Sequence, residues 1–262
     1  MMTVFVLATF LYFLGMVKYL LYLGLRNRIL FILATIMIAL GFLVETLALV
    51  QRSSITGHGP YMNVFEYCVF LAWVTFAAFL VAEGYFKIKP LGAFMVPIGF
   101  LLMLFGLLFS PETEPSFPVK AYWLTLHRTL SFLAFGAFSL VFAAGLMYLI
   151  QERQLKLKNF GGWYRRLPSL SILDDANRVG LVFGFPIITV GAAAAIVWSA
   201  QKYGELLKLN ASTASLMAAW GVYAVLAFGR VALGWRGRRA AALGVVGFCI
   251  VITSLLLHLH LR

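Results

Sequence analysis

Long apolar segments recur along the whole of this 262-residue chain. A helix of about 20 apolar residues, rising 1.5 Å per residue, crosses the roughly 30 Å hydrocarbon core of a bilayer. Eight such segments can be read, at residues 2–25, 29–51, 64–86, 91–110, 121–151, 178–201, 213–233 and 239–261. We therefore predict an all-α, polytopic membrane helix bundle with about eight transmembrane helices, forming a single transmembrane domain over residues 1–262.

The composition excludes an ordinary soluble domain. The chain is 63% hydrophobic and 11% charged, whereas a soluble globular domain is about one-quarter charged. Its net charge of +12 is explained by anionic lipid at the inner leaflet, without any nucleic acid. Cys68 and Cys249 lie in separate apolar spans and form no CxxC pair, so they indicate neither a disulfide framework nor a zinc site.

The distribution of lysine and arginine predicts the orientation. Thirteen of these cations lie in the odd-numbered connections between spans, and five lie in the even-numbered ones or at the C-terminus. Because short loops rich in Lys and Arg stay in the cytoplasm, we expect both termini on the outer side of the cytoplasmic membrane. The inner segment Arg153–Asn177 mixes cations with Leu, Phe, Trp and Tyr, and we expect it to lie on the membrane face as an interfacial stretch.

All four histidines fall at the ends of apolar segments that this topology places on the outer side. They are His58, His127, His258 and His260. Neutral imidazole is a strong axial ligand for haem iron, and two histidines from different helices can hold a haem by its iron alone. The alternative is that they are interfacial polar residues, which the ends of membrane helices tolerate well.

Several other residues are candidates for a site near the same side. Glu45 lies about two turns deep in its span, where a carboxylate is costly and usually faces the bundle interior. Glu66 follows Asn63 at a helix start, where the helix dipole alone would favour it. Trp73 and Trp123 belong to an outer aromatic set that either stacks on a porphyrin or forms an ordinary aromatic belt.

The patterns of common enzymes are missing from the sequence. We find no nucleophile–base pair, no Gly-rich phosphate loop and no HExxH metal motif. We therefore assign no catalytic residue and expect no independent enzymatic activity.

The stretch from residue 57 to 73 resembles the GHxPxxNxYE…FLAW signature of the cytochrome c assembly family, the CcsA and HemX group of haem-handling membrane proteins. The matching residues are Gly57-His58-Gly59-Pro60-Tyr61-Met62-Asn63-Val64-Phe65-Glu66 and Phe70-Leu71-Ala72-Trp73. Further matches follow in the same order, including Leu126-His127, Leu173-Asp174 and Gly184-Phe185-Pro186. The resemblance covers residues 42–262 best.

The resemblance implies a haem held between two histidines beneath a tryptophan-rich WWD platform, ready for attachment to an apocytochrome. His127 matches the first of those histidines, and His258 or His260 would serve as the second. The departures concern the platform, because residues 203–212 contain no tryptophan. In addition, Phe228 and Glu45 stand where the family has membrane histidines. These differences favour the HemX-like branch over a complete synthetase.

The leading hypothesis is thus a membrane protein that binds a non-covalent, b-type haem and serves c-type cytochrome biogenesis or haem metabolism. Its expected partners are membrane lipid, haem and other cytochrome c assembly components. One alternative is a HemX-like regulator or scaffold that controls glutamyl-tRNA reductase from the cytoplasmic side. The other is a transporter of haem or another small molecule.

Overall fold

The computed structural model describes all residues except 1, 110–121, 159–160, 163, 207–209 and 261–262, and it leaves out the side chains of residues 212 and 258–260. The described residues contain helices and no strand. The chain divides into two compact units, residues 1–119 and 120–262, and each is described by itself. A single domain over residues 1–262 remains a prediction.

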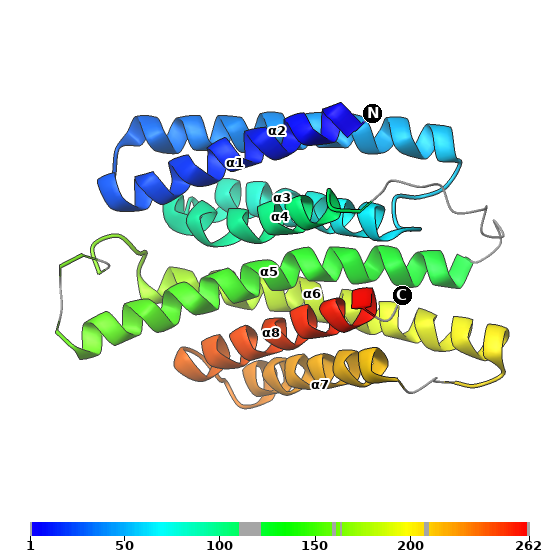
Figure 1. Ribbon diagram of the computed structural model, residues 1–262. Helices are drawn as coiled ribbons and strands as arrows, with labels where there is room; N and C mark the ends of the chain where they lie inside the picture. The colour runs from blue at the N-terminus through cyan, green and yellow to red at the C-terminus, as the bar shows by residue number, and fades with distance from the viewer. Residues whose placement is uncertain (1, 110–121, 159–160, 163, 207–209, 261–262) are drawn as a thin grey trace. The chain divides into compact units, whose positions relative to one another are not determined.

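Unit 1 (residues 1–119) is an antiparallel set of four long helices and one short 3₁₀ turn (Figure 1). Helix α1 packs against α2 and α4, and α3 packs against α4. The largest fully buried side chains between them are mostly aromatic, among them Tyr12, Tyr19 and Phe76. The elements are α1 (Met2–Leu25), α2 (Arg28–Thr56), α3 (Val64–Phe86), η1 (Lys89–Leu91) and α4 (Gly92–Gly106).

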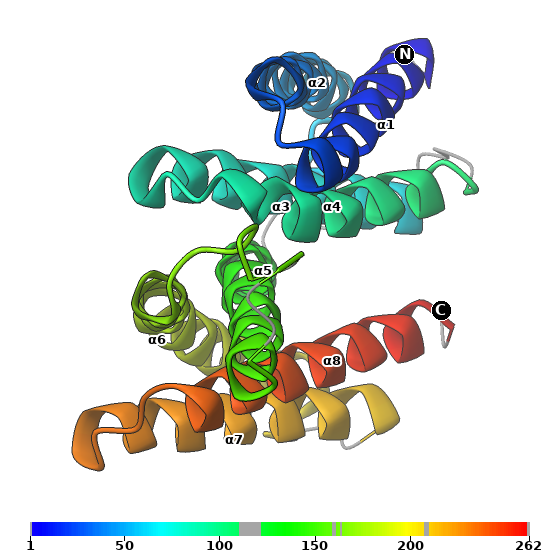
Figure 2. The same ribbon diagram turned by 90° about the vertical axis from the view of Figure 1, so that its left-hand side faces the viewer.

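Unit 2 (residues 120–262) is built around its longest helix, α5. Figure 2 shows α5 between α6 on one side and α8 on the other, and α7 packs against α8. Small residues permit these contacts: a side chain at Gly180 would meet the Ala137 carbonyl oxygen at 2.9 Å. The elements are α5 (Tyr122–Lys156), α6 (Leu170–Tyr203), α7 (Ala211–Ala232) and α8 (Arg238–His260).

The eight long helices confirm the predicted spans. Each of the eight is long and apolar enough to cross a membrane, among the residues that the structure describes. Large apolar side chains such as Leu47 (69% exposed) and Phe183 (64%) point outward from the helices, as expected for helices that face lipid. The protein is therefore a multi-pass, all-α membrane protein, while the side on which its termini lie remains a prediction.

Helix α6 differs from the prediction. It begins at Leu170 rather than near residue 178, and α5 continues to Lys156, so the expected interfacial stretch Arg153–Asn177 is partly helical. The added first turns of α6 bury Leu173, Ala176 and Asn177 on one face. The polar residues on the other face made these turns look like a connection.

Candidate functional site

The signature segment, residues 57–73, forms the connection from α2 to α3 and the first part of α3. Gly57 ends α2 with φ at 72°, a left-handed conformation that glycine adopts without strain. Asn63 is the N-cap of α3, and its side chain accepts a hydrogen bond from the Glu66 backbone N–H at 2.8 Å. This is the capping expected when asparagine precedes a helix by one residue. The predicted helix start at Asn63 and Glu66 is thus correct.

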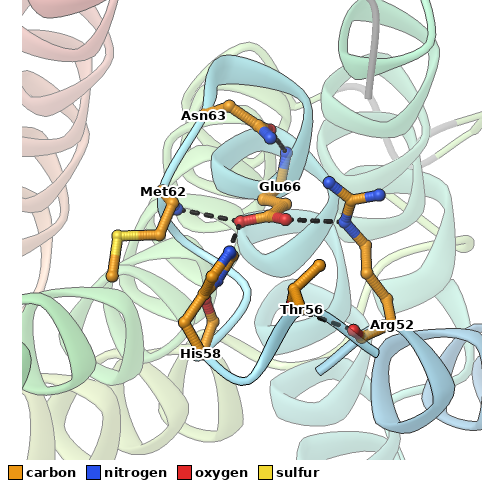
Figure 3. A network of polar contacts seen from close by, with 7 residues as sticks. Arg52, Thr56, His58, Met62, Asn63 and Glu66 are labelled. Atoms are coloured by element: carbon orange, nitrogen blue, oxygen red, sulfur yellow. Dashed lines mark hydrogen bonds and ion pairs between the residues drawn. The ribbon is translucent and has the colours of Figure 1, made fainter. Parts of the chain in front are cut away.

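Glu66 also forms a buried ion pair with the last turns of α2. Its Oε1 lies 2.6 Å from Nε of Arg52, and the two side chains are 0% and 5% exposed. Its other oxygen, Oε2, accepts a hydrogen bond from the Met62 backbone N–H at 2.9 Å. Figure 3 shows the carboxylate between these donors. Losing either partner of a buried ion pair is costly, so this pair favours the conformation of the α2–α3 connection in which both partners stay in contact.

His58 lies in the same connection and faces the same carboxylate. Its Nδ1 is 2.9 Å from the Gly59 carbonyl oxygen and 3.8 Å from Oε2 of Glu66 (Figure 3). Since a carbonyl oxygen only accepts, Nδ1 carries the proton in the neutral ring, and Nε2 then holds the free lone pair. The structure therefore brings together three of the predicted residues, His58, Asn63 and Glu66.

Trp73 lies two turns further along α3, beside α2. Its indole Nε1 donates a hydrogen bond to Thr46 Oγ1 at 2.8 Å, and its ring is nearly parallel to those of Phe42 and Phe70, at 5.3 and 5.6 Å. The indole forms one wall of an open groove of about 450 Å³. The groove is lined by Thr46, Leu49, Val50, Ser53, Ser54, Pro60, Phe70 and Trp73.

Glu45 is fully buried in the interior of unit 1. Its Oε2 accepts a hydrogen bond from the Tyr12 hydroxyl of α1 at 2.5 Å, and its Oε1 has no partner among the described residues. Tyr12 in turn stacks on Phe76 with ring centroids 3.7 Å apart. The carboxyl group thus faces the bundle interior, as the sequence predicted.

His127 lies in the second turn of α5, in unit 2, and is tied to α6. Its Nδ1 is 2.9 Å from the Gly191 carbonyl oxygen, so Nδ1 donates and Nε2 keeps its lone pair. Nε2 makes no hydrogen bond within the described part of the chain. A histidine that ligates a metal commonly donates its other ring N–H to a carbonyl in this way, which fixes the tautomer and the ring.

The other predicted ligands cannot be placed beside His127. The side chains of His258 and His260 lie outside the described residues, although their backbone belongs to the end of α8. His58 belongs to the other unit. Trp123, one turn before His127, is 42% exposed. No group of three or more His, Cys, Asp or Glu side chains that could hold a metal ion occurs in the described ranges.

A second polar cluster, which was not predicted from the sequence, lies in unit 2. Arg230 of α7 donates hydrogen bonds to both carboxylate oxygens of Asp174, at 3.3 and 3.0 Å, and to Oδ1 of Asn177 at 2.7 Å. Asn177 in turn donates to the Val141 carbonyl oxygen of α5, and the Gly237 N–H donates to Asp174. A lone arginine within an apolar span is itself a signal, because such residues are costly unless they are paired.

Comparison with known proteins identifies a family. The family model described as Cytochrome C assembly protein matches residues 61–260. A relative from Mesostigma viride, named cytochrome c biogenesis protein CcsA, is 25% identical over 251 residues, which cover 86% of this chain and 82% of the relative. Proteins of the same name from Prochlorococcus marinus (strain MIT 9303) and Gloeobacter violaceus are each 26% identical, over 83% and 81% of this chain and 78% and 79% of their own.

These matches run through both units, from the connection before α3 to the end of α8, and so include the region around Glu66 as well as His127. Since the family model covers well over half of the sequence, the protein belongs to the cytochrome c assembly protein family.

Proposed function

We propose that this membrane protein handles haem during the assembly of c-type cytochromes, and that it is not a complete synthetase by itself. Its relatives from Mesostigma viride and Prochlorococcus marinus are named for cytochrome c biogenesis, which supports the assembly role. Residues 203–212 carry no tryptophan, which argues against a complete attachment site. Haem in this proposal is cargo, bound without a covalent bond, whose iron is held by histidine.

The observation that carries the proposal is the hydrogen bond from His127 to Gly191. It leaves Nε2 as the only lone-pair nitrogen of the neutral ring, which is the atom that an iron ligand must offer. The residues present therefore fit one axial ligand. We propose His258 or His260 as the second, since both lie at the end of α8, which packs against α5.

We assign supporting roles in haem handling to residues of unit 1 and to Trp123 of unit 2. Glu66, Arg52 and Asn63 hold the connection between α2 and α3 and thereby position His58. Trp73, with its plane fixed by Thr46 and two neighbouring rings, and Trp123, exposed near His127, offer flat apolar faces. Glu45 is a further candidate site residue, because one of its carboxyl oxygens is buried without a described partner.

The test is an absorption spectrum of the full chain, purified in detergent after expression with ample haem. We expect a Soret band and split α and β bands on reduction, both lost in His127→Ala and in His258→Ala/His260→Ala. In His127→Gly, added imidazole should restore the band, because it refills the vacated ligand position. His58→Ala is the comparison at a second histidine whose Nδ1 has the same kind of bond.

Three outcomes would argue against the proposal. They are a wild-type protein free of haem, a spectrum unchanged in His127→Ala, and a loss in His127→Gly that imidazole does not repair. Size-exclusion profiles of the variants separate loss of ligand from loss of fold.

We also propose that the protein resides in the cytoplasmic membrane with both termini on the outer side. Alkaline phosphatase is active only outside the cytoplasm, so a fusion after Gly204 should be active and a fusion after Gly162 inactive. The reverse pattern would invert the topology. The regulator of glutamyl-tRNA reductase and the transporter have no support from the relatives described above.

A further inference from the structure

One end of unit 2 gathers most of the described cations of that unit. It is the end at which α5 finishes, α6 begins and α7 connects to α8 (left in Figure 1). At the other end, the described cations are Arg128 and Lys202. We call the first of these surfaces the basic end; its members are Arg153, Lys156, Lys158, Arg165, Arg166, Arg178, Arg236, Arg238 and Arg239.

Three contacts join these sequence segments into one surface. The Gln151 amide of α5 donates to the Tyr164 carbonyl oxygen at 3.2 Å, which fastens the connection between α5 and α6 to α5. The Arg238 Nε lies 3.7 Å from Oε2 of Glu152, and the Gly237 N–H donates to Asp174 at 3.0 Å. Both contacts bring the start of α8 against the end of α5 and the start of α6.

The acids at this end are already engaged. Glu152 pairs with Lys156 at 2.8 Å as well as with Arg238, and Asp175 lies 3.5 Å from Arg178. Asp174 is held by Arg230. The remaining cations form no ion pair with any residue that the structure describes, and all except the half-buried Arg166 are exposed: Arg153, Lys158, Arg165, Arg166, Arg236 and Arg239. Their positive charge is open to an external anion.

Exposed apolar side chains border the cations. Val231 and Leu233, at the end of α7, are 87% and 58% exposed, and Leu157, directly after α5, is 63% exposed. On a surface that faces water, these apolar side chains would be unfavourably hydrated. Cations beside exposed apolar residues at helix ends are suited to the level of lipid headgroups, where the apolar part meets the acyl chains and the cations meet phosphate.

We propose that the basic end binds the headgroups of anionic phospholipids, with Arg153, Arg236 and Arg239 contacting phosphate. Charge complementarity and the apolar border favour a lipid over a soluble polyanion, which would match the charge alone. The proposal does not depend on haem handling, since it concerns other residues and a different ligand.

The test is native mass spectrometry of the full chain in detergent, titrated with phosphatidylglycerol or with phosphatidylcholine. We expect the anionic lipid to bind more tightly and to be released at 0.5 M salt, because charge interactions are screened there. The pair Arg236→Gln/Arg239→Gln should weaken phosphatidylglycerol binding roughly tenfold or more. The matched pair Arg128→Gln/Lys202→Gln, at the other end of unit 2, should leave it within about twofold.

Equal binding of the two lipids would overturn the proposal, as would equal effects of the two variant pairs. Soluble glycerol 3-phosphate provides a further arm: if it displaces phosphatidylglycerol at comparable concentration, the surface is a general anion site and the commitment to lipid is wrong. The wild-type comparison of the two lipids stands even if a variant pair fails to fold.

Discussion

Among the residues that the structure describes, each unit has one well-buried arginine paired with a carboxylate, but the two pairs connect different parts of their units. In unit 1, Arg52 and Glu66 are 14 positions apart and close the connection between neighbouring helices. In unit 2, Arg230 and Asp174 are 56 positions apart and join α7 to α6, with the start of α8 and, through Asn177, α5 attached to the same cluster. The first pair shapes a loop, whereas the second fixes helix packing.

The pairs also differ in burial and in how well they are satisfied. The side chain of Glu66 is 0% exposed and both of its oxygens have partners, while that of Asp174 is 18% exposed. Arg230 has a second acceptor in Asn177, yet its Nε is buried without a described partner. We therefore expect the unit 1 pair to be the more sensitive to loss of its acid.

Replacing Glu66 should have the largest effect. Glu66→Gln leaves the Arg52 guanidinium buried without its counter-charge, and removing one partner of a buried pair costs about 3–5 kcal/mol. Denaturant unfolding in detergent micelles measures this loss. The double change Arg52→Met/Glu66→Met is the control, because it removes both charges and should recover much of the stability. A Glu66→Gln protein as stable as the wild type would show that the pair does not hold the connection.

Asp174→Asn should cost less, about 1.5–3 kcal/mol, because the site is partly exposed and Asn177 still accepts from Arg230. We further expect faster amide exchange at Gly237, whose N–H donates to Asp174, when exchange is followed by mass spectrometry. Asp175→Asn, at an exposed neighbouring carboxylate, is the matched control and should change neither quantity. If the two variants behave alike, the cluster does not join α8 to α6.

Glu45 is another buried carboxyl group, but its described partner is the Tyr12 hydroxyl and not an arginine. Tyr12→Phe removes the hydroxyl that the Glu45 side chain accepts from, and should lower the free energy of unfolding by about 1–2 kcal/mol. Tyr19→Phe is the control, since Tyr19 is also fully buried but bonds to the Thr35 hydroxyl. An unchanged stability in Tyr12→Phe would mean that this bond does not hold the Glu45 carboxyl group.

The smallest effects should come from the two matching helix caps. Asn63 and Asn210 each accept a backbone N–H at 2.8 Å, at the starts of α3 and α7. Replacement of a capping asparagine by alanine typically costs about 1 kcal/mol. We expect Asn63→Ala to reach that value because its cap positions Glu66, and Asn210→Ala to cost about half as much because the site is exposed. If thermal unfolding shows equal losses for the two variants, the cap at Asn63 does not contribute to the Arg52–Glu66 pair.

What the sequence predicted correctly depends on local rules. The spans follow from runs of apolar residues, and the start of α3 follows from Asn63 and Glu66 three residues apart. The partners of the polar groups could not be predicted, because Arg52–Glu66, Tyr12–Glu45 and Arg230–Asp174 each require knowing which helices are neighbours and how they are rotated. The bond from His127 to Gly191 belongs to the same class, since a backbone carbonyl leaves no trace in the pattern of residue types.

The lengths of α4 and α5 have a consequence for the bilayer that surrounds them. Helix α4 has 15 residues and α5 has 35, which correspond to about 22 Å and 52 Å at 1.5 Å per residue. Together with the preceding turn η1, α4 gives a span of 18 residues, or about 27 Å, close to a hydrocarbon core of roughly 30 Å. Helix α5 exceeds this core and must tilt or extend beyond it, so the two spans favour different bilayer thicknesses. The protein should therefore be sensitive to acyl-chain length, with its most stable state in a bilayer of intermediate thickness.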